Sequence, residues 1–448
     1  MKKLICIAVV FLALTNLLGQ EKQTTFEKIE GHWEGAFIKA NAYQRFDVQF
    51  YKKDTAYFSL QIIEDWHPQF GEFELPVTID SDGKITTNTG YGKAVLNLDE
   101  KNLEILGFIE GSVPSISINL KKVPEPPAPD YNTEEITIPN GDISLHGHLH
   151  SPISKNTNTA IILVGGRGCY AGSTKYDLYA KVLRKYGVSV LVFNKRGTGK
   201  STGDCALATI DDLASDVIAC KKFLENHPKN FDKIGVLGSS AGGWVMVKAE
   251  EDTDFDFMIS VVGPATSVRD QQMQSLNYGI DFYKLSETAR TQLTDYTNLL
   301  FDAKPNKTNF NRIQELLKSA ETEDWRKLLD DTDVPSSIET MDELWVRRHN
   351  YNPGPQLSEF DKPFLGIYGE IDWIVPYKEN IDRLKKLFTG DRNKLLKTVV
   401  AYQAEHGTEV KGKFTSLSED KSYWRFFRIS PQVLIEIVDF LKTHNLID

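Results

Sequence analysis

The chain has 448 residues, of which 41% are hydrophobic and 25% charged, a composition typical of a globular protein with ample material for a buried core. The length exceeds that of one ordinary domain and predicts two or three. The formal net charge is −10 at pH 7. This acidity argues against general binding to nucleic acid or to anionic membranes, because both need a basic surface.

Residues 1–19 have the pattern of a secretory signal peptide. Lys2 and Lys3 precede an uncharged apolar run over residues 4–18, and Gly19 supplies a small residue at the expected cleavage site. The run is short for a membrane-spanning helix. We therefore expect a cleaved leader and a secreted or periplasmic protein without stable membrane insertion; a retained anchor is the alternative. Cleavage would remove two of the 52 basic residues and leave all 62 acidic ones, for a formal charge of −12.

Three cysteines lie beyond the leader, namely Cys169, Cys205 and Cys220. An odd number in an oxidising compartment allows one disulfide and one buried thiol. Cys169 and Cys205 each follow a Gly-rich loop, whereas Cys220 falls within a helical stretch. This placement favours a Cys169–Cys205 pair, with three free thiols as the alternative.

Residues 22–122 read as short strands separated by turn signals, for example 35–38, 46–50 and 103–108, with a hairpin turn at 81–84. This pattern predicts a small all-β domain, either a barrel or a sandwich. Gly31-His32-Trp33 resembles the opening strand of lipocalin-like barrels. A Pro-rich linker over residues 123–130 then predicts a stiff, extended connection to the rest of the chain.

From residue 131 to 448 helices and mostly apolar strands alternate, which predicts an α/β fold with a doubly wound, largely parallel sheet. One helix is expected from 211 to 226, and a last helix begins at Pro431 after Ser430. The segment from about 267 to 360 is polar, helix-prone and rich in aromatics, which predicts a helical cap. The expected strands are 134–138, 143–150, 159–165, 188–194, 233–238, 257–263, 364–369 and 396–402.

A candidate nucleophile follows the apolar run 233–237. Residues 238–242, Gly-Ser-Ser-Ala-Gly, have the form of a nucleophile elbow, in which a strand turns sharply into a helix and exposes a serine. The crowded backbone needs very small residues two positions before and after that serine. Ser240 meets this condition, whereas Ser239 would need the large Leu237 at one of these positions. We therefore predict Ser240 as the nucleophile.

A serine nucleophile needs a base, and the base needs an acid that orients it. In this architecture the chain order is serine, acid, histidine. Three histidines follow Ser240: His349 in the expected cap, His444 at the end of the last helix, and His406 in a loop after an apolar strand. His406 stands where a catalytic base belongs, and we predict it as the base.

The acid is expected at the end of the preceding strand, 364–369. Asp372 is the first choice, because it lies in the turn before the next helix, and Glu370 is the reserve candidate. Two backbone N–H groups should bind the oxyanion of the tetrahedral intermediate. One is expected from Ala241, which follows the nucleophile, and the other from Arg167 in the Gly-rich loop 165–168. A simple tight turn is the alternative for that loop.

The stretch from about 131 to 448 resembles the α/β-hydrolase superfamily, in particular its secreted esterase and serine-aminopeptidase-like members. The resemblance rests on an opening hairpin at 134–152, the elbow at 238–244, and a loop at 194–201 similar to the Asp-x-Arg-Gly-x-Gly-x-Ser loop of the family. Two positions depart from the pattern. Gly165-Gly166 stands where the family usually has His-Gly, and Asn194 replaces the usual Asp.

The resemblance implies a serine hydrolase that forms an acyl-enzyme on a small-molecule acyl substrate, without a cofactor. We expect carboxylic esters or thioesters to be cleaved. A peptidase, an aminopeptidase or an acyltransferase would use the same residues. A protein that binds lipid or glycan without catalysis is the alternative from another class.

One further pattern concerns metals. His146, His148 and His150 alternate along a predicted strand, so they share one face and could hold an ion. The sequence shows no accompanying cluster of carboxylates or cysteines. An ordinary strand edge that faces solvent is therefore the preferred interpretation, and no metal is expected.

Overall fold

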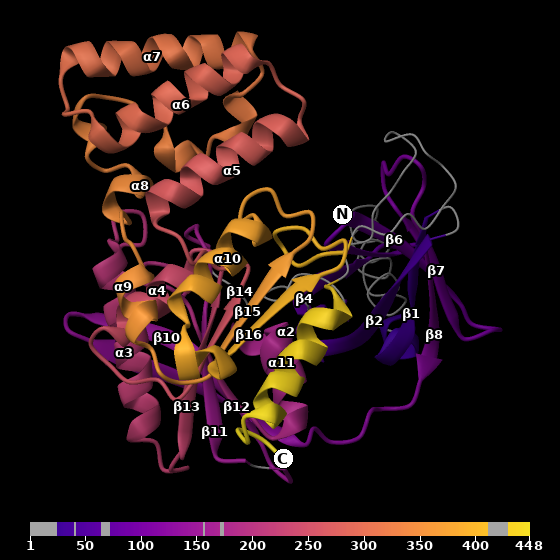
Figure 1. The fold of residues 1–448 in the computed structure, drawn as a ribbon. Coiled ribbons are helices and arrows are strands. Elements are labelled where there is room, and N and C mark those ends of the chain that lie inside the picture. Colours follow the sequence, from indigo (N-terminus) through magenta and orange to yellow (C-terminus); the bar gives the residue numbers. More distant parts are fainter. Residues whose placement is uncertain (1–24, 40–41, 64–71, 156, 171–173, 411–428) are drawn as a thin grey trace. The chain divides into compact units, whose positions relative to one another are not determined.

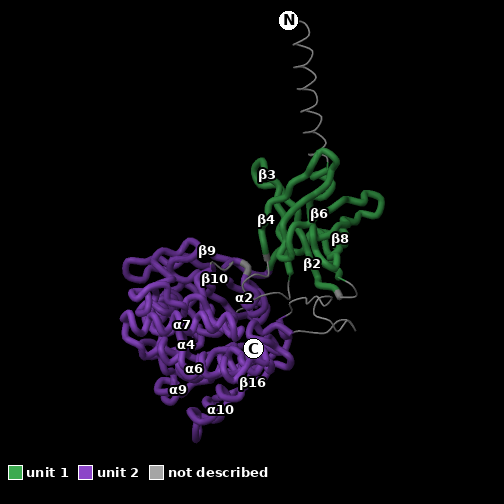
Figure 2. The backbone as a smooth tube through the Cα atoms, turned by 90° about the horizontal axis from the view of Figure 1, so that it is seen from above, with its two compact units in different colours: residues 1–129, 411–428 green, residues 130–410, 429–448 purple. Residues whose placement is uncertain are grey.

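The computed structural model describes residues 25–39, 42–63, 72–155, 157–170, 174–410 and 429–448. These residues form two compact units, one ending at Pro129 and the other beginning at Asp130 (Figure 2). The expected leader, residues 1–19, lies outside the described residues. Within the described ranges, none of the helices has the length and apolar character needed to span a bilayer.

The first unit is a closed barrel of antiparallel strands that follow one another in chain order, with the first strand also paired to the last. Alternate side chains point inward, so large aromatic residues such as Trp33, Phe37, Phe46 and Phe50 fill its core. Of the two all-β architectures that the sequence allows, the chain adopts the barrel. Its strands are β1 (Gly31–Lys39), β2 (Ala42–Lys53), β3 (Ala56–Ile62), β4 (Glu72–Ile79), β5 (Ile85–Thr89), β6 (Gly92–Asp99), β7 (Glu104–Ile109) and β8 (Ser117–Val123).

The second unit is built on an eight-stranded sheet with the order β16-β15-β14-β13-β11-β12-β10-β9. The strands from β11 to β16 run parallel to one another, and β10 runs antiparallel to both β12 and β9. The predicted α/β fold with a mostly parallel sheet is therefore confirmed. The strands are β9 (Tyr131–Asn140), β10 (Ile143–Pro152), β11 (Thr159–Val164), β12 (Ser189–Phe193), β13 (Lys233–Ser239), β14 (Met258–Val261), β15 (Phe364–Gly369) and β16 (Leu396–Ala401).

Helices cover both faces of this sheet. On one face lie α3 (Ile210–Glu225), α4 (Gly242–Glu250) and α10 (Tyr377–Leu387), whose apolar residues share a cluster with β11 and β13. On the other lie α2 (Leu178–Leu183) and α11 (Pro431–Thr443), packed on β12, β14 and β15. The expected helical period holds in α3, where Val217, Cys220 and Leu224 are fully buried. Thr209 and Asp212 start α3 with reciprocal capping hydrogen bonds.

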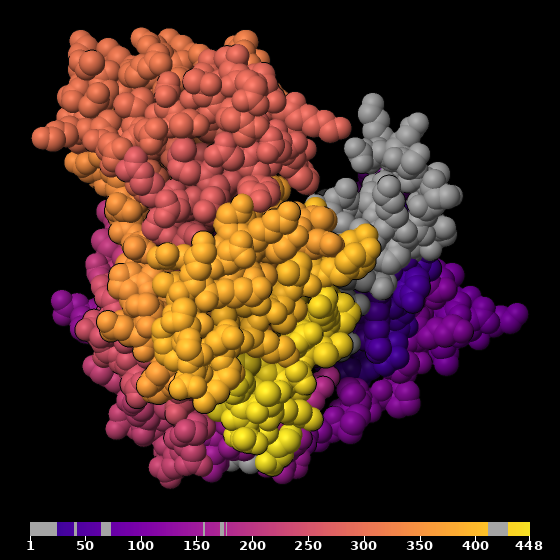
Figure 3. Space-filling view, in the orientation of Figure 1, coloured from indigo at the N-terminus to yellow at the C-terminus, as the bar shows by residue number. Residues whose placement is uncertain are grey.

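Helices also fill the long segment between β14 and β15, namely α5 (Val268–Phe282), α6 (Glu287–Asp302), α7 (Lys307–Thr322), α8 (Trp345–Arg348) and α9 (Gly354–Glu359). The first three form a layer beyond one end of the sheet, which we call the cap (Figure 1). Gln271 of α5 donates to Ile374 O (2.5 Å) and Tyr278 donates to Glu379 (2.8 Å). These bonds tie the cap to the segment after β15, and the two surfaces meet in the space-filling view (Figure 3).

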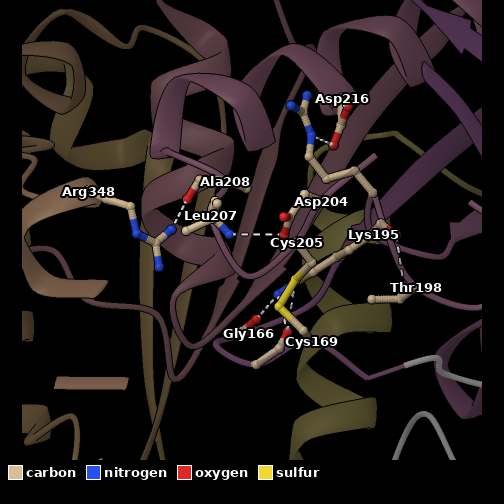
Figure 4. The surroundings of a disulfide bond; sticks show 12 residues. Gly166, Cys169, Lys195, Thr198, Asp204, Cys205, Leu207, Ala208, Asp216 and Arg348 are labelled. Atoms are coloured by element: carbon tan, nitrogen blue, oxygen red, sulfur yellow. Dashed lines mark hydrogen bonds and ion pairs between the residues drawn. A yellow bond between two sulfur atoms is a disulfide. The ribbon is translucent and has the colours of Figure 1, made fainter. Parts of the chain in front are cut away.

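A disulfide joins Cys169, in the loop after β11, to Cys205, in the loop after β12 (Figure 4). This is the pairing that the sequence favoured, and Cys220 remains a buried thiol in α3. The bond closes a loop with a sequence separation of 36 residues. Closing such a loop restricts the unfolded chain far more than the folded one.

Replacing both disulfide cysteines by serine should lower the free energy of unfolding of the second unit by about 3–4 kcal/mol, from the chain entropy of a loop of this length. Urea unfolding followed by tryptophan fluorescence measures the change. Wild-type protein in a reducing agent should show a similar loss. Equal stability of the variant and the oxidised wild type would contradict the prediction.

Candidate active site

Ser240 stands at a sharp turn between β13 and α4. Its backbone φ of +52° is a left-handed conformation that costs a non-glycine residue on the order of 1 kcal/mol. Two hydrogen bonds hold the turn. Ser240 N–H donates to Val261 O at the end of β14 (3.0 Å), and Gly243 N–H donates to Ser240 O (2.8 Å).

The glycines on both sides of Ser240 are needed because the turn leaves no room for a Cβ atom at their positions. A Cβ added at Gly238 would lie 2.4 Å from Gly242 O, and one added at Gly242 would lie 2.4 Å from Val164 O of β11. Backbone atoms stand at both positions and cannot move aside as a flexible side chain would. The turn therefore forms only with glycine at these positions, the same glycines that distinguish Ser240 from Ser239 in the sequence.

The structure brings Ser240, His406 and Asp372 together in one hydrogen-bonded line. His406 Nε2 lies 2.8 Å from Ser240 Oγ, and His406 Nδ1 lies 2.9 Å from Asp372 Oδ2. The other carboxylate oxygen of Asp372 accepts hydrogen bonds from the backbone N–H groups of Ile374 (2.8 Å) and Val375 (3.0 Å). Both oxygens of the fully buried Asp372 side chain are thus occupied, which fixes the orientation of the imidazole.

The His406 imidazole is more basic than an isolated one. Burial by itself lowers its pKa, but the negative charge of Asp372 and the hydrogen bond to it outweigh that effect, so that the pKa is raised above 6.5. At neutral pH the ring can therefore take up a proton from Ser240 Oγ with the positive charge stabilised by Asp372.

The other candidates lie elsewhere. Glu370, the reserve acid, is exposed and accepts a hydrogen bond from Gln403 N–H (2.9 Å). His349 is buried in the segment between β14 and β15, where it stacks on Trp345 at 4.4 Å. Its pKa is lowered to about 4, chiefly by burial. His444 is the residue that ends α11.

The loop that the sequence singled out for oxyanion binding, residues 165–168, lies against Ser240. We call it the glycine loop. A Cβ added at Gly166 would lie 3.0 Å from Ser240 Cβ and 3.5 Å from Ser240 Oγ. On the other side of the serine, Ala241 is the N-terminal cap of α4, so its N–H belongs to the positive end of the helix dipole. Gly166 and Ala241 therefore lie beside Ser240 and come from two different elements.

Lys195, just after β12, holds the glycine loop through its carbonyls. Its ammonium donates to the backbone oxygens of Gly166 and Gly168, the latter at 3.2 Å (Figure 4). Burial lowers the pKa of Lys195 to about 8. Beside it, Arg196 binds the carboxylates of Asp212 (2.8 Å) and Asp216 (2.9 Å) and braces α3. Both residues belong to the loop 194–201 that resembles the family motif, but the sequence did not reveal that Lys195 binds these carbonyls.

The side chain of Arg167 leaves the glycine loop and binds the segment between β14 and β15. Its guanidinium donates to Asp333 Oδ2 (2.7 Å) and to the Thr332 hydroxyl, and it stacks over the Trp345 ring at 4.2 Å. Asp333 is fully buried, and its other oxygen accepts from Val346 N–H (3.0 Å). Sequence reasoning missed this connection, since no spacing rule relates positions 167 and 333.

Residues 155–406, more than half of the chain, match the family described as serine aminopeptidase, S33. The chain belongs to this family of α/β-hydrolases. Membership supports a serine hydrolase of the α/β-hydrolase type and confirms the resemblance seen in the elbow and its neighbouring loops. A search of curated proteins gave no match.

Among solved structures, an esterase from Pyrococcus furiosus is 18% identical, with a TM-score of 0.42 over 70% of this chain and 92% of that chain. A proline iminopeptidase-related protein from Thermus thermophilus is 16% identical, with a TM-score of 0.41 over 70% of this chain and 98% of that one. The Est1E protein from Butyrivibrio proteoclasticus, solved with ferulic acid bound, is 15% identical, with a TM-score of 0.42 over 69% and 99%.

Removing the charge of the buried carboxylate in Asp372→Asn should lower the pKa of His406, because that charge and its hydrogen bond are what raise it. The imidazole would then lose its proton at a lower pH than in the wild type. NMR titration of the ring, assigned by comparison with His406→Gln, measures the shift. Glu370→Gln is the matched control and should leave the titration unchanged; an unchanged pKa in Asp372→Asn would refute the prediction.

Proposed function

We propose that the chain is a secreted serine hydrolase that cleaves carboxylic esters or thioesters through an acyl-enzyme. The observation that carries the proposal is the unbroken line of hydrogen bonds from Ser240 through His406 to the buried Asp372. In this proposal Ser240 Oγ attacks the carbonyl carbon while His406 Nε2 takes up its proton. Asp372 keeps the ring oriented and stabilises the imidazolium that forms.

The second half of the cycle uses the same residues in reverse. His406 returns the proton to the leaving alcohol or thiol, and a water molecule then attacks the acyl-enzyme with His406 again as the base. Release of the acid frees the Ser240 hydroxyl. A non-hydrolytic acyl transfer differs only in the nucleophile of this second step, with another hydroxyl or amine in place of water.

We assign the backbone N–H groups of Ala241 and Arg167 to the oxyanion. The position of Gly166 against Ser240 supports this assignment, because the next residue in the glycine loop is Arg167. Removing one such donor typically raises the barrier by about 3–4 kcal/mol. The Lys195 ammonium on the carbonyls of Gly166 and Gly168 keeps these oxygens engaged, which favours an arrangement in which N–H groups, not oxygens, face the reacting carbonyl.

The charges around the glycine loop favour esters over substrates with a free amino group. An aminopeptidase needs an anionic group to bind the substrate ammonium. Asp330 and Asp333 contact the Arg167 guanidinium of this loop at 3.3 and 2.7 Å, so its positive charge offsets one of their two negative charges. Asp333 is also fully buried, which makes this pair of carboxylates a poor binding site for a substrate ammonium.

Apolar surface beside Asp372, the proposed acid, also favours esters as substrates. Trp373 directly follows Asp372 and lies 5.9 Å from Tyr283 and 6.5 Å from Phe282, ring centre to ring centre. The side chains of Phe282 and Tyr283 are exposed, at 51% and 42%. Exposed aromatic side chains next to a polar site suit an apolar acyl or alcohol group.

One observation favours the aminopeptidase as the second candidate. Glu409 lies in the same loop as His406, and a Cβ added at Gly407 would be 3.1 Å from its carboxyl carbon. Burial raises the pKa of Glu409, as expected for a carboxyl removed from bulk water. A substrate ammonium beside it would favour the ionised form of Glu409.

The proposed location rests on the leader pattern of residues 1–19. The Cys169–Cys205 disulfide agrees with it, because disulfides persist in oxidising compartments outside the cytosol. A mature chain beginning after Gly19 is the form in which activity should be assayed.

The mature protein should react with a fluorophosphonate probe, and Ser240→Ala should abolish the labelling because the attacking oxygen is gone. Ser239→Ala is the matched control, since its hydroxyl is one residue away, and should keep most of the labelling. Gel fluorescence measures the labelling of the wild type and of the two variants. Labelling of the wild type no stronger than that of Ser240→Ala would instead support a binding protein without catalysis.

Esters and thioesters of graded acyl length should be hydrolysed with higher kcat/KM than aminoacyl amides that carry a free α-amino group. Glu409→Gln should leave ester hydrolysis within about threefold of wild type, because removing a charge remote from the reacting bond changes the barrier by less than about 1 kcal/mol. A preference for the aminoacyl amides that disappears in Glu409→Gln would overturn the ester proposal in favour of the aminopeptidase.

Arg167→Ala should lower kcat about 10- to 100-fold with little change in KM. Without its side-chain contacts the residue would no longer hold its backbone N–H in place, and this donor stabilises the transition state but not the bound substrate. Arg167→Lys should restore part of the rate by keeping the charge near Asp333. Arg269→Ala is the control, since Arg269 pairs with Asp302 (2.5 Å) and stacks on Phe301 (5.2 Å), away from the glycine loop. A rise in KM with unchanged kcat would show that Arg167 binds substrate instead.

A further inference from the structure

A second group of chemically active side chains lies on β9 and β10, at the end of the sheet opposite to β15 and β16, which precede Asp372 and His406. It consists of Glu135, His146 and His148, and one potential ligand atom from each lies within 4.8 Å of the others. The sequence interpretation set the histidines aside because no cluster of carboxylates or cysteines accompanied them. The β9–β10 register nevertheless pairs one carboxylate, that of Glu135, directly with His148 across the two strands.

The two imidazoles are held in fixed orientations. His146 Nε2 lies 2.8 Å from Glu135 Oε1, and the His146 and His148 rings are perpendicular with centres 5.3 Å apart. His148 Nδ1 lies 2.7 Å from the hydroxyl of Thr174. Such outer partners orient metal-binding histidines and set their tautomer. With Nδ1–H donating to Thr174, the ring nitrogen of His148 that would bind an ion is Nε2.

His150, the third histidine of the strand, does not join this group. It is fully buried, its Nε2 lies 3.0 Å from Thr174 O, and its Nδ1 lies 2.9 Å from the guanidinium of Arg184. Both of its nitrogens are therefore committed to protein groups. The expectation of a strand edge that faces solvent is wrong for His150, because this residue is fully buried next to η1 (Thr174–Tyr176).

The amide of Asn194 supplies an independent observation at His146. Asn194 is only 6% exposed, and its Nδ2 lies 3.3 Å from His146 Nδ1. Its Oδ1 is buried and has no hydrogen-bond partner within the described part of the chain. Rotating the amide by about 180° would let Oδ1 accept a hydrogen bond from Nδ1–H of His146, since the two ends of an amide have nearly the same shape. His146 would then carry its proton on Nδ1, and the lone pair at Nε2 would point toward Glu135 and be available to a cation held between the two atoms.

The protonation states suit a metal ion. Hydrogen bonds from Lys200 and then from His146 lower the pKa of Glu135 to about 2, so this carboxylate is ionised. Burial lowers the pKa of His148, so this imidazole is neutral at pH 7. An ionised carboxylate and a neutral imidazole are the forms in which Glu135 and His148 would bind a metal.

We propose that Glu135, His146 and His148 bind a divalent transition-metal ion such as Zn²⁺. The ligands would be Glu135 Oε1 and Nε2 of both imidazoles, with water at the remaining position, a set that suits zinc. The His146 proton moves from Nε2 to Nδ1, where it is hydrogen-bonded to the amide oxygen of the rotated Asn194. Lys200, whose ammonium now donates to Glu135 Oε1 and whose side chain is 69% exposed, competes with the ion and moves into solvent.

Calorimetric titration of Zn²⁺ into the chelator-treated mature chain, prepared without a polyhistidine tag, tests the proposal. The wild type should bind one ion, and His148→Ala and Glu135→Gln should each bind it at least about tenfold more weakly. Lys200→Met should bind it more tightly than the wild type, because the competing ammonium is gone. A purely structural ion pair between His146 and Glu135 predicts no such gain.

The matched control is His227→Ala. His227 Nε2 lies 3.3 Å from Glu134, and its side chain is 10% exposed, as is that of His146, but among the described residues it belongs to no metal-binding group. Its removal should leave Zn²⁺ binding unchanged. Absence of binding by the wild type, or wild-type affinity in both His148→Ala and Glu135→Gln, would overturn the proposal. So would equal affinities of Lys200→Met and wild type. Circular dichroism verifies that each variant is folded.

Discussion

The close approach of three backbone segments around Ser240 is the constraint on which the second unit depends. Gly238, Gly242 and the end of β11 come so near one another that no Cβ fits at either glycine. That contact lets β13 turn into α4 within a few residues and keeps Ser240 at a positive φ. The strained turn persists because the sheet on one side and α4 on the other determine the positions of its ends. The line to His406 and Asp372 starts from this turn.

The glycine loop shows how the surroundings hold a short flexible segment. Gly165, Gly166 and Gly168 offer little intrinsic stiffness, yet three separate interactions restrain them. Lys195 binds two of the loop carbonyls, the disulfide anchors Cys169 next to the loop, and the Arg167 side chain binds Asp333 and Trp345. These partners come from the loop after β12 and from the segment before β15. A change in any of them can therefore alter the position of the loop without touching Ser240.

Local patterns predicted the features that depend on near neighbours in the chain. The alternation of strands and helices indicated the sheet, the helical period indicated α3, and the elbow glycines singled out Ser240. Position after a strand was enough to choose His406 and Asp372, because parallel strands bring their carboxyl ends to one edge of a sheet. The pairing of Glu135 with His148 could not be predicted in this way. It depends on the register of β9 against β10, and a register shifted by one residue would turn Glu135 to the other face.

The fold class and the residues at the elbow could be predicted from the amino-acid order alone, because these follow from short-range periodicity and from steric demands within a few residues. The family was inferred from the resemblance of the elbow, the opening hairpin and the loop 194–201 to known motifs. The packed chain was needed to show that Arg167 binds Asp333, that Lys195 caps the carbonyls of the glycine loop, and that Glu135 accompanies His146 and His148. Each of these contacts joins side chains from different elements. Ion pairs and hydrogen bonds act over a few ångströms, so they depend on how the elements pack against one another. The spacing of residues along the chain does not predict that packing.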